Sequence, residues 1–372
     1  MSSSHPIIFS FFAGSGFLDL GFEMSGFDVR FVNEFHAPFL EAYKHSRKHM
    51  QLPQPTYGHH LGSIEDFVKG EKAEQLQNFV KNAKTEALVG FIGGPPCPDF
   101  SIAGKQKGIE GENGKLTKVY IDAIIKNQPD FFLFENVKGL WRTSKHRTFY
   151  DEMKNALVKA GYVLSDRLTN SIEFGVPQDR DRILMFGILQ KHTKATTEEE
   201  LATEFGWERN IIFDRKVVLD KGLWPETSSY VENSKRKLPR HLEKYRELTV
   251  QYWFETNNVT KHPNAKHHFQ PKAMHRFLNV LEGDDSKKSF KRLHRFRYSP
   301  TAAYGNNEVH LHPYKSRRLS AAEALAIQSL PKEFYFPSTM TLSDMFKTIG
   351  NGVPYLTSKG IAETIKQYIE SI

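Results

Sequence analysis

The first half of the chain alternates short apolar runs with longer amphipathic or polar stretches. The apolar runs have the length and composition of buried strands, and they predict strands at Ile7–Phe12, Asp28–Asn33, Leu88–Ile92, Phe131–Phe134 and Ile183–Ile188. The stretches between them predict helices at Ala37–Lys48, Glu71–Lys84, Leu116–Lys126 and Phe149–Ala160. This alternation is typical of an α/β domain with a mostly parallel, doubly wound sheet.

The pattern changes after residue 190. From there to about Pro300 the sequence is polar, basic and irregular, with few long apolar runs. Regular patterning returns at Ser320, which has capping-box spacing to Glu323, and Leu356–Ile372 predicts a closing helix. We therefore expect a first domain at residues 1–190, an inserted or second domain at 191–300, and a segment at 301–372 that completes the first domain.

Composition narrows the class of protein. A chain of 372 residues with 39% hydrophobic content can bury a large core. Its one cysteine excludes an internal disulfide and a cysteine-rich zinc site, which favours a reducing, cytoplasmic compartment. No secretion signal is evident at the start, and no apolar run reaches the roughly 18 residues that span a bilayer, so we expect no membrane partner.

The charge balance favours a polyanionic partner. The chain has 51 Lys and Arg against 43 Asp and Glu, and many of the basic residues lie between Lys235 and Arg318. Aromatic residues are interleaved with the basic ones in this stretch, for example Trp253, Phe277 and Phe290. This combination suits phosphate contacts and base stacking, so it predicts nucleic-acid binding.

The single cysteine, Cys97, lies in a stiff segment that directly follows an apolar run. Two glycines and two prolines precede it and a third proline follows, so the segment predicts a rigid loop at the carboxyl end of a strand. A thiol presented by such a loop suits nucleophilic attack. A lone free cysteine is also commonly a small buried hydrophobic residue, and the segment alone fits either role.

Two elements near the N-terminus fit an adenosine-containing cofactor. Phe12–Gly16 brings two glycines directly after the first predicted strand, where backbone amides can bind a ligand. Glu34 ends the second predicted strand, where a carboxylate accepts both hydroxyls of a ribose. Asp19 stands in place of a third glycine, which disfavours a nicotinamide dinucleotide. A simple glycine turn and a surface glutamate remain the alternatives.

Three further motifs bring polar groups to strand ends or turns. Glu135 follows the run Phe131–Phe134, and burial there favours a proton donor, whereas a solvent-facing glutamate is the alternative. Alternation within a strand places Gln178, Arg180 and Arg182 on one face, either as donors to a ligand or as a surface salt-bridge lattice. Gly350–Pro354 predicts a turn before the last helix.

In order and in separation, these motifs resemble the motif series of the DNA (cytosine-5)-methyltransferases of the prokaryotic restriction-modification type. The residues that carry the resemblance are Phe12-Ala13-Gly14-Ser15-Gly16, Glu34, Pro95-Pro96-Cys97, Glu135-Asn136-Val137, Gln178-Asp179-Arg180-Asp181-Arg182, Arg318-Leu319-Ser320 with Glu323, and Gly350-Asn351-Gly352-Val353-Pro354. The resemblance covers nearly the whole chain except Gln190 to about Arg292, which occupies the place of the family's variable target-recognition domain.

The resemblance implies an S-adenosylmethionine-dependent methyltransferase fold with a smaller, irregular DNA-binding domain. It implies methyl transfer to carbon 5 of cytosine at a specific sequence in double-stranded DNA, through a Cys97 adduct with a flipped-out base. The implied catalytic residues are Cys97, Glu135, Arg180 and Arg182, and the implied DNA contacts are Ser101 and Gln178. The implied S-adenosylmethionine-binding residues are Phe12, Ala13, Gly14, Gly16, Glu34, Phe35, Ile64, Pro96, Leu116, Asn351 and Val353.

The chain departs from the family pattern at three positions. Pro98 replaces the glutamine usual after the nucleophile, Phe17 replaces a common glycine, and Ser63 stands where an aspartate often contacts the adenine amine. These departures affect the expected grip of the loop on DNA and the adenine hydrogen bond.

The nearest alternative is a cytosine-5 methyltransferase that acts on transfer RNA, although the large insert favours DNA. A nicotinamide oxidoreductase leaves Cys97, Glu135 and Arg182 unexplained, and a catalytically silent relative is disfavoured by the same cysteine and glutamate. We further expect a monomer, associated with the nucleoid, that is paired with a separate cognate restriction endonuclease.

Overall fold

The computed structural model describes residues 5–96, 112–141, 144–270, 274–287, 289–302, 304 and 310–372, so the predictions for Cys97, Pro98 and Ser101 lie outside the described residues. The strands are β1 (Ile7–Phe11), β2 (Asp28–Glu34), β3 (His59–Leu61), β4 (Val89–Gly93), β5 (Phe131–Val137), β6 (Tyr162–Asn170), β7 (Asp181–Leu189), β8 (Lys291–Arg292) and β9 (His310–Leu311). The α-helices are α1 (Phe17–Met24), α2 (Ala37–His49), α3 (Glu65–Val68), α4 (Ala73–Ala83), α5 (Glu112–Asn127), α6 (Ser144–Lys159), α7 (Glu198–Phe205), α8 (Arg215–Val218), α9 (Val250–Thr256), α10 (Met274–Leu278), α11 (Ala321–Ile327), α12 (Leu342–Asn351) and α13 (Tyr355–Ile369).

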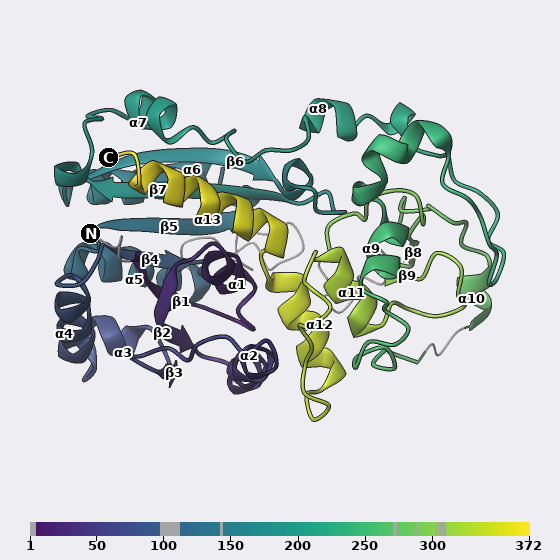
Figure 1. Ribbon diagram of the computed structural model, residues 1–372, viewed down its shortest axis with the longest axis horizontal. Helices are drawn as coiled ribbons and strands as arrows, with labels where there is room; N and C mark the ends of the chain where they lie inside the picture. The colour runs from purple at the N-terminus through teal and green to yellow at the C-terminus, as the bar shows by residue number, and fades with distance from the viewer. Residues whose placement is uncertain are drawn as a thin grey trace.

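A seven-stranded sheet forms the centre of the larger part of the molecule (Figure 1). Its strand order is β3-β2-β1-β4-β5-β7-β6, and every neighbouring pair is parallel except those that β7 makes with β5 and β6. The predicted mostly parallel sheet is therefore confirmed. The strands β3 and β6 were not predicted from the sequence. The predicted strand Phe131–Phe134 is too short, because pairing with β7 continues to Val137.

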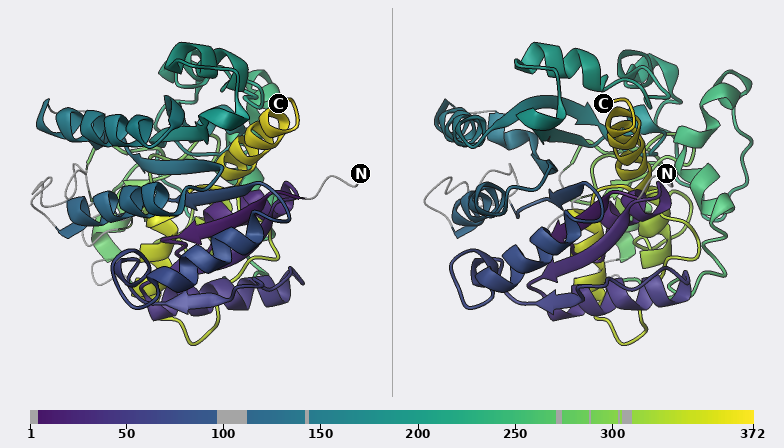
Figure 2. Two further views of the ribbon diagram at one scale, coloured as in Figure 1. Left: turned by 90° about the vertical axis from the view of Figure 1, so that its left-hand side faces the viewer. Right: turned by 60° about the vertical axis from the view of Figure 1, so that its left-hand side comes forward.

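Helices cover both faces of the sheet, as expected for a doubly wound arrangement (Figure 2). Side chains alternate along β1, so that Ile7, Phe9 and Phe11 face one core while Ile8 faces the other. The first core is closed by apolar residues of α3, α4, α5 and α6, and the second by residues of α1, α2, α7 and α13. The loops at the strand ends are thereby held on a rigid three-layer scaffold.

The smaller part of the molecule has short elements and its own apolar clusters. Figure 1 shows α9, α10, β8 and β9 at the end opposite the sheet. Trp224, Leu242 and Phe296 belong to one buried cluster there. The helix α7 follows residue 190, where we placed a domain boundary, yet its Leu201 and Phe205 pack in the core of the sheet. The segment directly after the last strand of the sheet thus covers the sheet before the chain enters the smaller part.

Buried arginines hold the smaller part together. Arg292 is fully buried, lies over the ring of Tyr230 with its guanidinium carbon 3.8 Å from the ring centroid, and donates to the carbonyl oxygens of Val280 at 2.8 Å and His312 at 2.6 Å. Arg295 is also buried. It donates to Glu282 and to the carbonyl oxygen of Ser234. Both arginines belong to the basic stretch Lys235–Arg318, and the nucleic-acid contact predicted for that stretch does not apply to them, because their donors bind groups of the same chain.

The helix α11 joins the two parts. Ser320 caps it by accepting a bond from the Glu323 N–H at 3.3 Å, and the Ser320 N–H donates to the Glu323 carboxylate at 2.8 Å, which confirms the predicted capping box. One side of α11 packs with Phe17 and Phe346, and another with Phe254.

Candidate active site

The predicted polar groups gather at one edge of the sheet. Phe11 at the end of β1 is level with Gly93 of β4, and Gly93 is level with Phe134 of β5, so the carboxyl ends of these parallel strands meet. The antiparallel strand β7 begins at this edge, and its Arg182 is opposite Val137. The ends of four strands thus bring the motifs together, as in open α/β sheets generally.

The glycine loop after β1 is held by Glu34. Gly14 and Gly16 have φ values of 57° and 80°, a left-handed region that favours glycine. The Gly14 N–H donates to one Glu34 carboxylate oxygen at 2.7 Å, and the His36 N–H donates to the other at 2.8 Å. Each carboxylate oxygen keeps a second acceptor site, so Glu34 can order the loop and still accept from a ligand.

A buried cluster of charged side chains, which was not predicted from the sequence, lies beneath this loop. The Arg47 guanidinium donates to the Gly16 carbonyl oxygen at 2.6 Å, pairs with Glu23 at 2.7 Å and lies over the Tyr43 ring. Asp19 is fully buried and accepts from the Ser10 hydroxyl at 2.8 Å. Burial raises the pKa of Asp19 to about 7, although Arg47 acts to lower it. Asp19 and Arg47 are far apart in the sequence, and nothing in their spacing indicates that they lie in one cluster.

The residues expected to bind the cofactor differ in exposure. The Phe35 side chain is 75% exposed, which leaves an aromatic surface beside Glu34 available for stacking, whereas Ile64 is buried in the core. A Cβ atom added to Gly14 would meet only Thr348 Oγ1, at 3.8 Å, so there is open space above the loop. Phe12, Leu116 and Pro96 are half-buried, Ala13 and Val353 are buried, and Asn351 is exposed.

Glu135 and Arg182 form an ion pair at this edge. Arg182 Nε lies 2.8 Å from Glu135 Oε1, and both side chains are mostly buried. A Cβ atom on Gly94 would lie 2.5 Å from Glu135 Oε2, so a larger residue at position 94 would displace the carboxylate. Gly94 and the half-buried Pro96 lead directly to Cys97. The described end of the cysteine loop therefore lies against the Glu135 carboxylate.

Arg180 and Gln178 are turned into the protein. Arg180 is fully buried and donates to the carbonyl oxygens of Ala302 at 3.2 Å and Gly350 at 2.9 Å. Burial lowers the pKa of Arg180 well below its usual value, and Arg182 nearby adds to this. The Gln178 side chain is fully buried and accepts from the Ala302 N–H at 3.1 Å. The predicted turn at Gly350–Pro354 is too long at its start, because Gly350 and Asn351 belong to the last turn of α12. The Arg180 contacts attach the end of α12 to the segment directly before β7, and in this structure neither side chain reaches the surface.

Two of the departures from the family pattern have structural partners. Phe17 is buried, and a Cβ atom on Gly352 would lie 2.3 Å from its ring, so the glycine at position 352 accommodates the larger residue at position 17. The Ser63 hydroxyl accepts from the Glu65 N–H at 3.2 Å at the start of α3. Both residues thus have local packing or capping roles.

Within the described ranges, no group of three or more His, Cys, Asp or Glu side chains is arranged to hold a metal ion. The described helices include none that is long and apolar enough to cross a membrane.

Comparison with known proteins gives one consistent family. A family model for C-5 cytosine-specific DNA methylases matches residues 7–367. The chain is 59% identical over 367 residues to the Type II methyltransferase M.NmeDI of Neisseria meningitidis serogroup C, which covers 98% of this chain and 84% of that protein. It is 27% identical to the Type II methyltransferase M.MthTI of Methanothermobacter thermautotrophicus, with 98% of each chain covered.

Solved structures show the same fold. The chain is similar to a putative DNA modification methyltransferase encoded within an E. coli prophage, with a TM-score of 0.67, 21% identity, and 99% and 100% of the two chains covered. It is also similar to the S. pombe Dnmt2 methyltransferase, with a TM-score of 0.60, 11% identity and 99% of each chain covered. With the family match across almost its whole length, the chain belongs to the C-5 cytosine-specific DNA methylases.

Proposed function

We propose that this DNA cytosine-5 methyltransferase of the Type II class acts through a covalent bond between the Cys97 sulfur and carbon 6 of a cytosine that has left the double helix. The observation that carries the proposal is the ion pair of Glu135 with Arg182 beside Gly94, because Gly94 precedes the only cysteine of the chain by three residues. A thiol, a carboxylate and a guanidinium would thus meet around one base.

The chemistry requires activation of a weak nucleophile. Carbon 5 of cytosine attacks poorly until the Cys97 thiolate adds at carbon 6, which moves the electron pair of the 5,6 double bond toward carbon 5. Glu135 would hydrogen-bond or protonate ring nitrogen 3, and Arg182 would donate to the ring carbonyl oxygen, so that the developing negative charge is stabilised. Once carbon 5 has bonded to the methyl group, loss of its proton to water and elimination of the Cys97 thiolate restore the aromatic ring.

We assign Arg180 to support of this site. The family resemblance implied a catalytic role for Arg180, but its donors bind the carbonyl oxygens of Ala302 and Gly350. It would therefore act by holding the end of α12 at Gly350 against the start of β7, while Arg182 contacts the base.

The glycine loop fits S-adenosylmethionine. The open space above Gly14, the free acceptor sites of Glu34 and the exposed ring of Phe35 suit the methionine, ribose and adenine parts of that molecule, respectively. The other residues we assign to it are Phe12, Ala13, Gly16, Ile64, Pro96, Leu116, Asn351 and Val353. When bound, S-adenosylmethionine supplies the methyl group that carbon 5 accepts.

The smaller part would bind the DNA and select its sequence. Exposed basic side chains such as Lys261 and Lys266 can neutralise phosphates there, and base flipping costs a few kcal/mol of unstacking that these contacts can offset. We place Ser101 at the DNA side of the site. Gln178, the other predicted DNA contact, is buried and accepts from the Ala302 N–H, so we assign it to support of the segment before β7. We also propose that the enzyme is a monomer of the cytoplasm that modifies the nucleoid and protects it from a separate cognate endonuclease.

The direct test is transfer of a labelled methyl group from S-adenosylmethionine to unmethylated duplex DNA and, in parallel, to transfer RNA. We expect 5-methylcytosine in the DNA at one recurring sequence, and no methyl transfer by Cys97→Ser, which should still bind S-adenosylmethionine. Methylation of transfer RNA alone would overturn the proposed substrate.

A further inference from the structure

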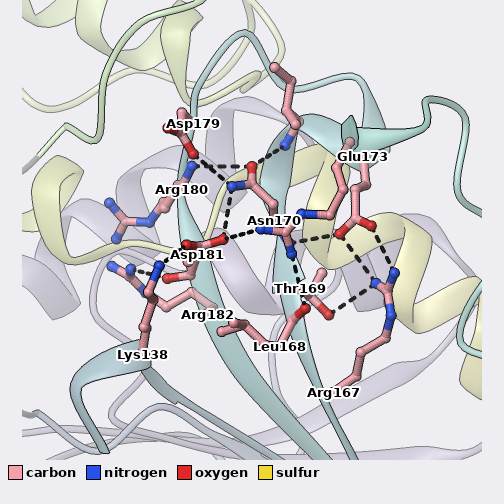
Figure 3. A network of polar contacts seen from close by, with 12 residues as sticks. Lys138, Arg167, Leu168, Thr169, Asn170, Glu173, Asp179, Arg180, Asp181 and Arg182 are labelled. Atoms are coloured by element: carbon pink, nitrogen blue, oxygen red, sulfur yellow. Dashed lines mark hydrogen bonds and ion pairs between the residues drawn. The ribbon is translucent and has the colours of Figure 1, made fainter. Parts of the chain in front are cut away.

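The last residue of β6, Asn170, has its whole side chain engaged inside the protein (Figure 3). Its Nδ2 donates to Asp179 Oδ1 at 2.7 Å and to Asp181 Oδ1 at 2.9 Å, and its Oδ1 accepts from the N–H groups of Ile172 at 3.1 Å and Arg180 at 3.3 Å. The residue is fully buried. A primary amide has two donors and two acceptor sites, so every one of them is used.

These bonds determine which way the neighbouring arginines point. Successive side chains of an extended chain lie on opposite sides, so holding Asp179 and Asp181 on the side of Asn170 directs Arg180 and Arg182 to the other side. Figure 3 shows this division around the start of β7. Arg182 thereby reaches Glu135 on the neighbouring strand β5.

Other charged groups surround the two aspartates and the backbone of Asn170. Lys138 and Arg215 bind Asp181 at 2.7 Å and 3.1 Å. Burial acts to raise the pKa of Asp181, but the bonds from Lys138 and Asn170 hold it below its usual value. The Asn170 N–H donates to Glu173, which pairs with Arg167. The side chain of Asn170 is thus a neutral donor among the carboxylates of three acids.

We propose that Asn170 is a positioning residue of the methyl-transfer reaction: by binding Asp179 and Asp181 together, it keeps Arg182 against Glu135. The inference rests on the proposed function of that ion pair. Asn170 itself acts only through β7 and makes no contact with the reacting base.

The variant Asn170→Asp tests this with almost no change in size. The new carboxyl group must carry a proton to donate to either aspartate, and once ionised it repels both of them. Because the two acids favour its protonated form, the variant should work best at low pH. We expect its kcat to fall by about 100-fold at pH 8 relative to the unmodified enzyme, since a small displacement of a positioned group has effects of that order, and to recover partly at pH 6.

Two companion variants separate positioning from folding. Adding Asp179→Asn to Asn170→Asp restores a donor on the other side of the same bond and should recover kcat at pH 8. Asn264→Asp is the matched control, since Asn264 is also buried and uses its amide inside the protein. Its Nδ2 donates to the carbonyl oxygen of Phe336 at 3.1 Å, and its Oδ1 accepts from the N–H of Phe336 at 2.8 Å. The Asn264→Asp variant should have a lower melting temperature, but its kcat per folded molecule should depend on pH as in the unmodified enzyme.

A readout that needs no activity distinguishes this proposal from the proposed function. The NMR signal of Arg182 Nε–H, followed in selectively labelled protein, should shift and exchange faster in Asn170→Asp at pH 8. An unchanged signal together with an unchanged pH profile overturns the role of Asn170. A shifted signal in a protein whose unmodified form transfers no methyl group to DNA supports the positioning and refutes the proposed function. The affinity for S-adenosylmethionine should stay within about twofold, because Asn170 forms no hydrogen bond with any residue assigned to the cofactor.

Discussion

The two parts of the molecule each contain a buried pair of glutamate with arginine, and the pairs differ in what their remaining donors do. Glu282 and Arg295 lie 2.7 Å apart, with side chains that are 0% and 3% exposed, and Arg295 also binds the carbonyl and hydroxyl oxygens of Ser234. Glu135 and Arg182 lie 2.8 Å apart, with exposures of 10% and 14%.

The pair at the sheet edge is less complete. Arg182 Nη1 donates to the carbonyl oxygen of Asp181 at 2.8 Å, and the described residues give its Nη2 no partner. Arg295 binds Glu282 and Ser234 with its donors, whereas Arg182 has a donor without a partner among the described residues, and we propose that this donor binds the base. The comparison teaches that these two ion pairs are alike in distance but differ in how far their own chain satisfies the arginine, and the donor left over on Arg182 is the reason why we propose a ligand for that pair.

Removing the carboxylate from each pair gives the largest expected contrast. Glu135→Gln should lower kcat by about 100-fold to 10,000-fold, the usual range for a lost acid–base group, with little change in melting temperature. Glu282→Gln should lower the melting temperature and leave kcat per folded molecule almost unchanged, because it removes the charged partner of the buried Arg295. Single-turnover methyl transfer and thermal unfolding of both variants test this. An equal loss of kcat per folded molecule in the two variants would contradict the different roles of the two ion pairs.

A second contrast concerns basic residues within the smaller part. Arg292→Met leaves the carbonyl oxygens of Val280 and His312 without their donor, so we expect a loss of about 3 kcal/mol or more in the free energy of unfolding. Lys266→Ala removes an exposed charge and should leave stability unchanged. If Lys266 contacts a phosphate, the salt dependence of DNA affinity becomes shallower by about 0.9 in the log–log slope. Urea unfolding and binding at several salt concentrations distinguish the two, and an unchanged stability of Arg292→Met would contradict the structural role.

The acid beneath the cofactor loop should have an effect on stability that depends on pH. The pKa of Asp19 is raised by burial from 3.8 to about 7, so the folded state holds a proton that the unfolded state releases. Its contribution to stability is complete below pH 3.8 and is lost as the pH rises to about 7, by about 4 kcal/mol at most. Asp19→Asn removes this dependence, so its stability relative to the unmodified enzyme should rise between pH 4 and pH 7. A difference that is constant over that interval would falsify the assignment.

The sequence predicted much of the sheet but little of the smaller part. The strands around Phe9 and Phe132 are apolar on both faces because helices cover both, and that pattern is visible in one dimension. The strand β3 is three residues long and polar, and β6 mixes apolar and charged residues at the edge of the sheet, so neither has the same signal. The direction of β7 depends on its partners in space, which no local pattern records.

The site was predictable as far as its residues follow strand ends. Glu34 and Glu135 could be placed because parallel strands end at one edge. Arg182 lies at the start of the antiparallel strand β7, so its place at that edge depends on a strand direction that the sequence does not record. The contacts of Arg47 with Gly16 and of Asn170 with the two aspartates are set by the packing of separate elements. For the same reason the basic stretch of the smaller part could not be divided, from sequence, into exposed lysines and buried arginines such as Arg292.

The central claim is that Cys97 bonds to the base at the edge formed by Gly94, Glu135 and Arg182. The most direct measurement is the mass of the protein after incubation with S-adenosylmethionine and a duplex that carries 5-fluorocytosine at the methylated position, followed by peptide mapping. The account predicts one stable protein–DNA adduct on the peptide containing Cys97, greatly slowed in Arg182→Lys. No adduct on active enzyme, or an adduct at any other side chain, would contradict it.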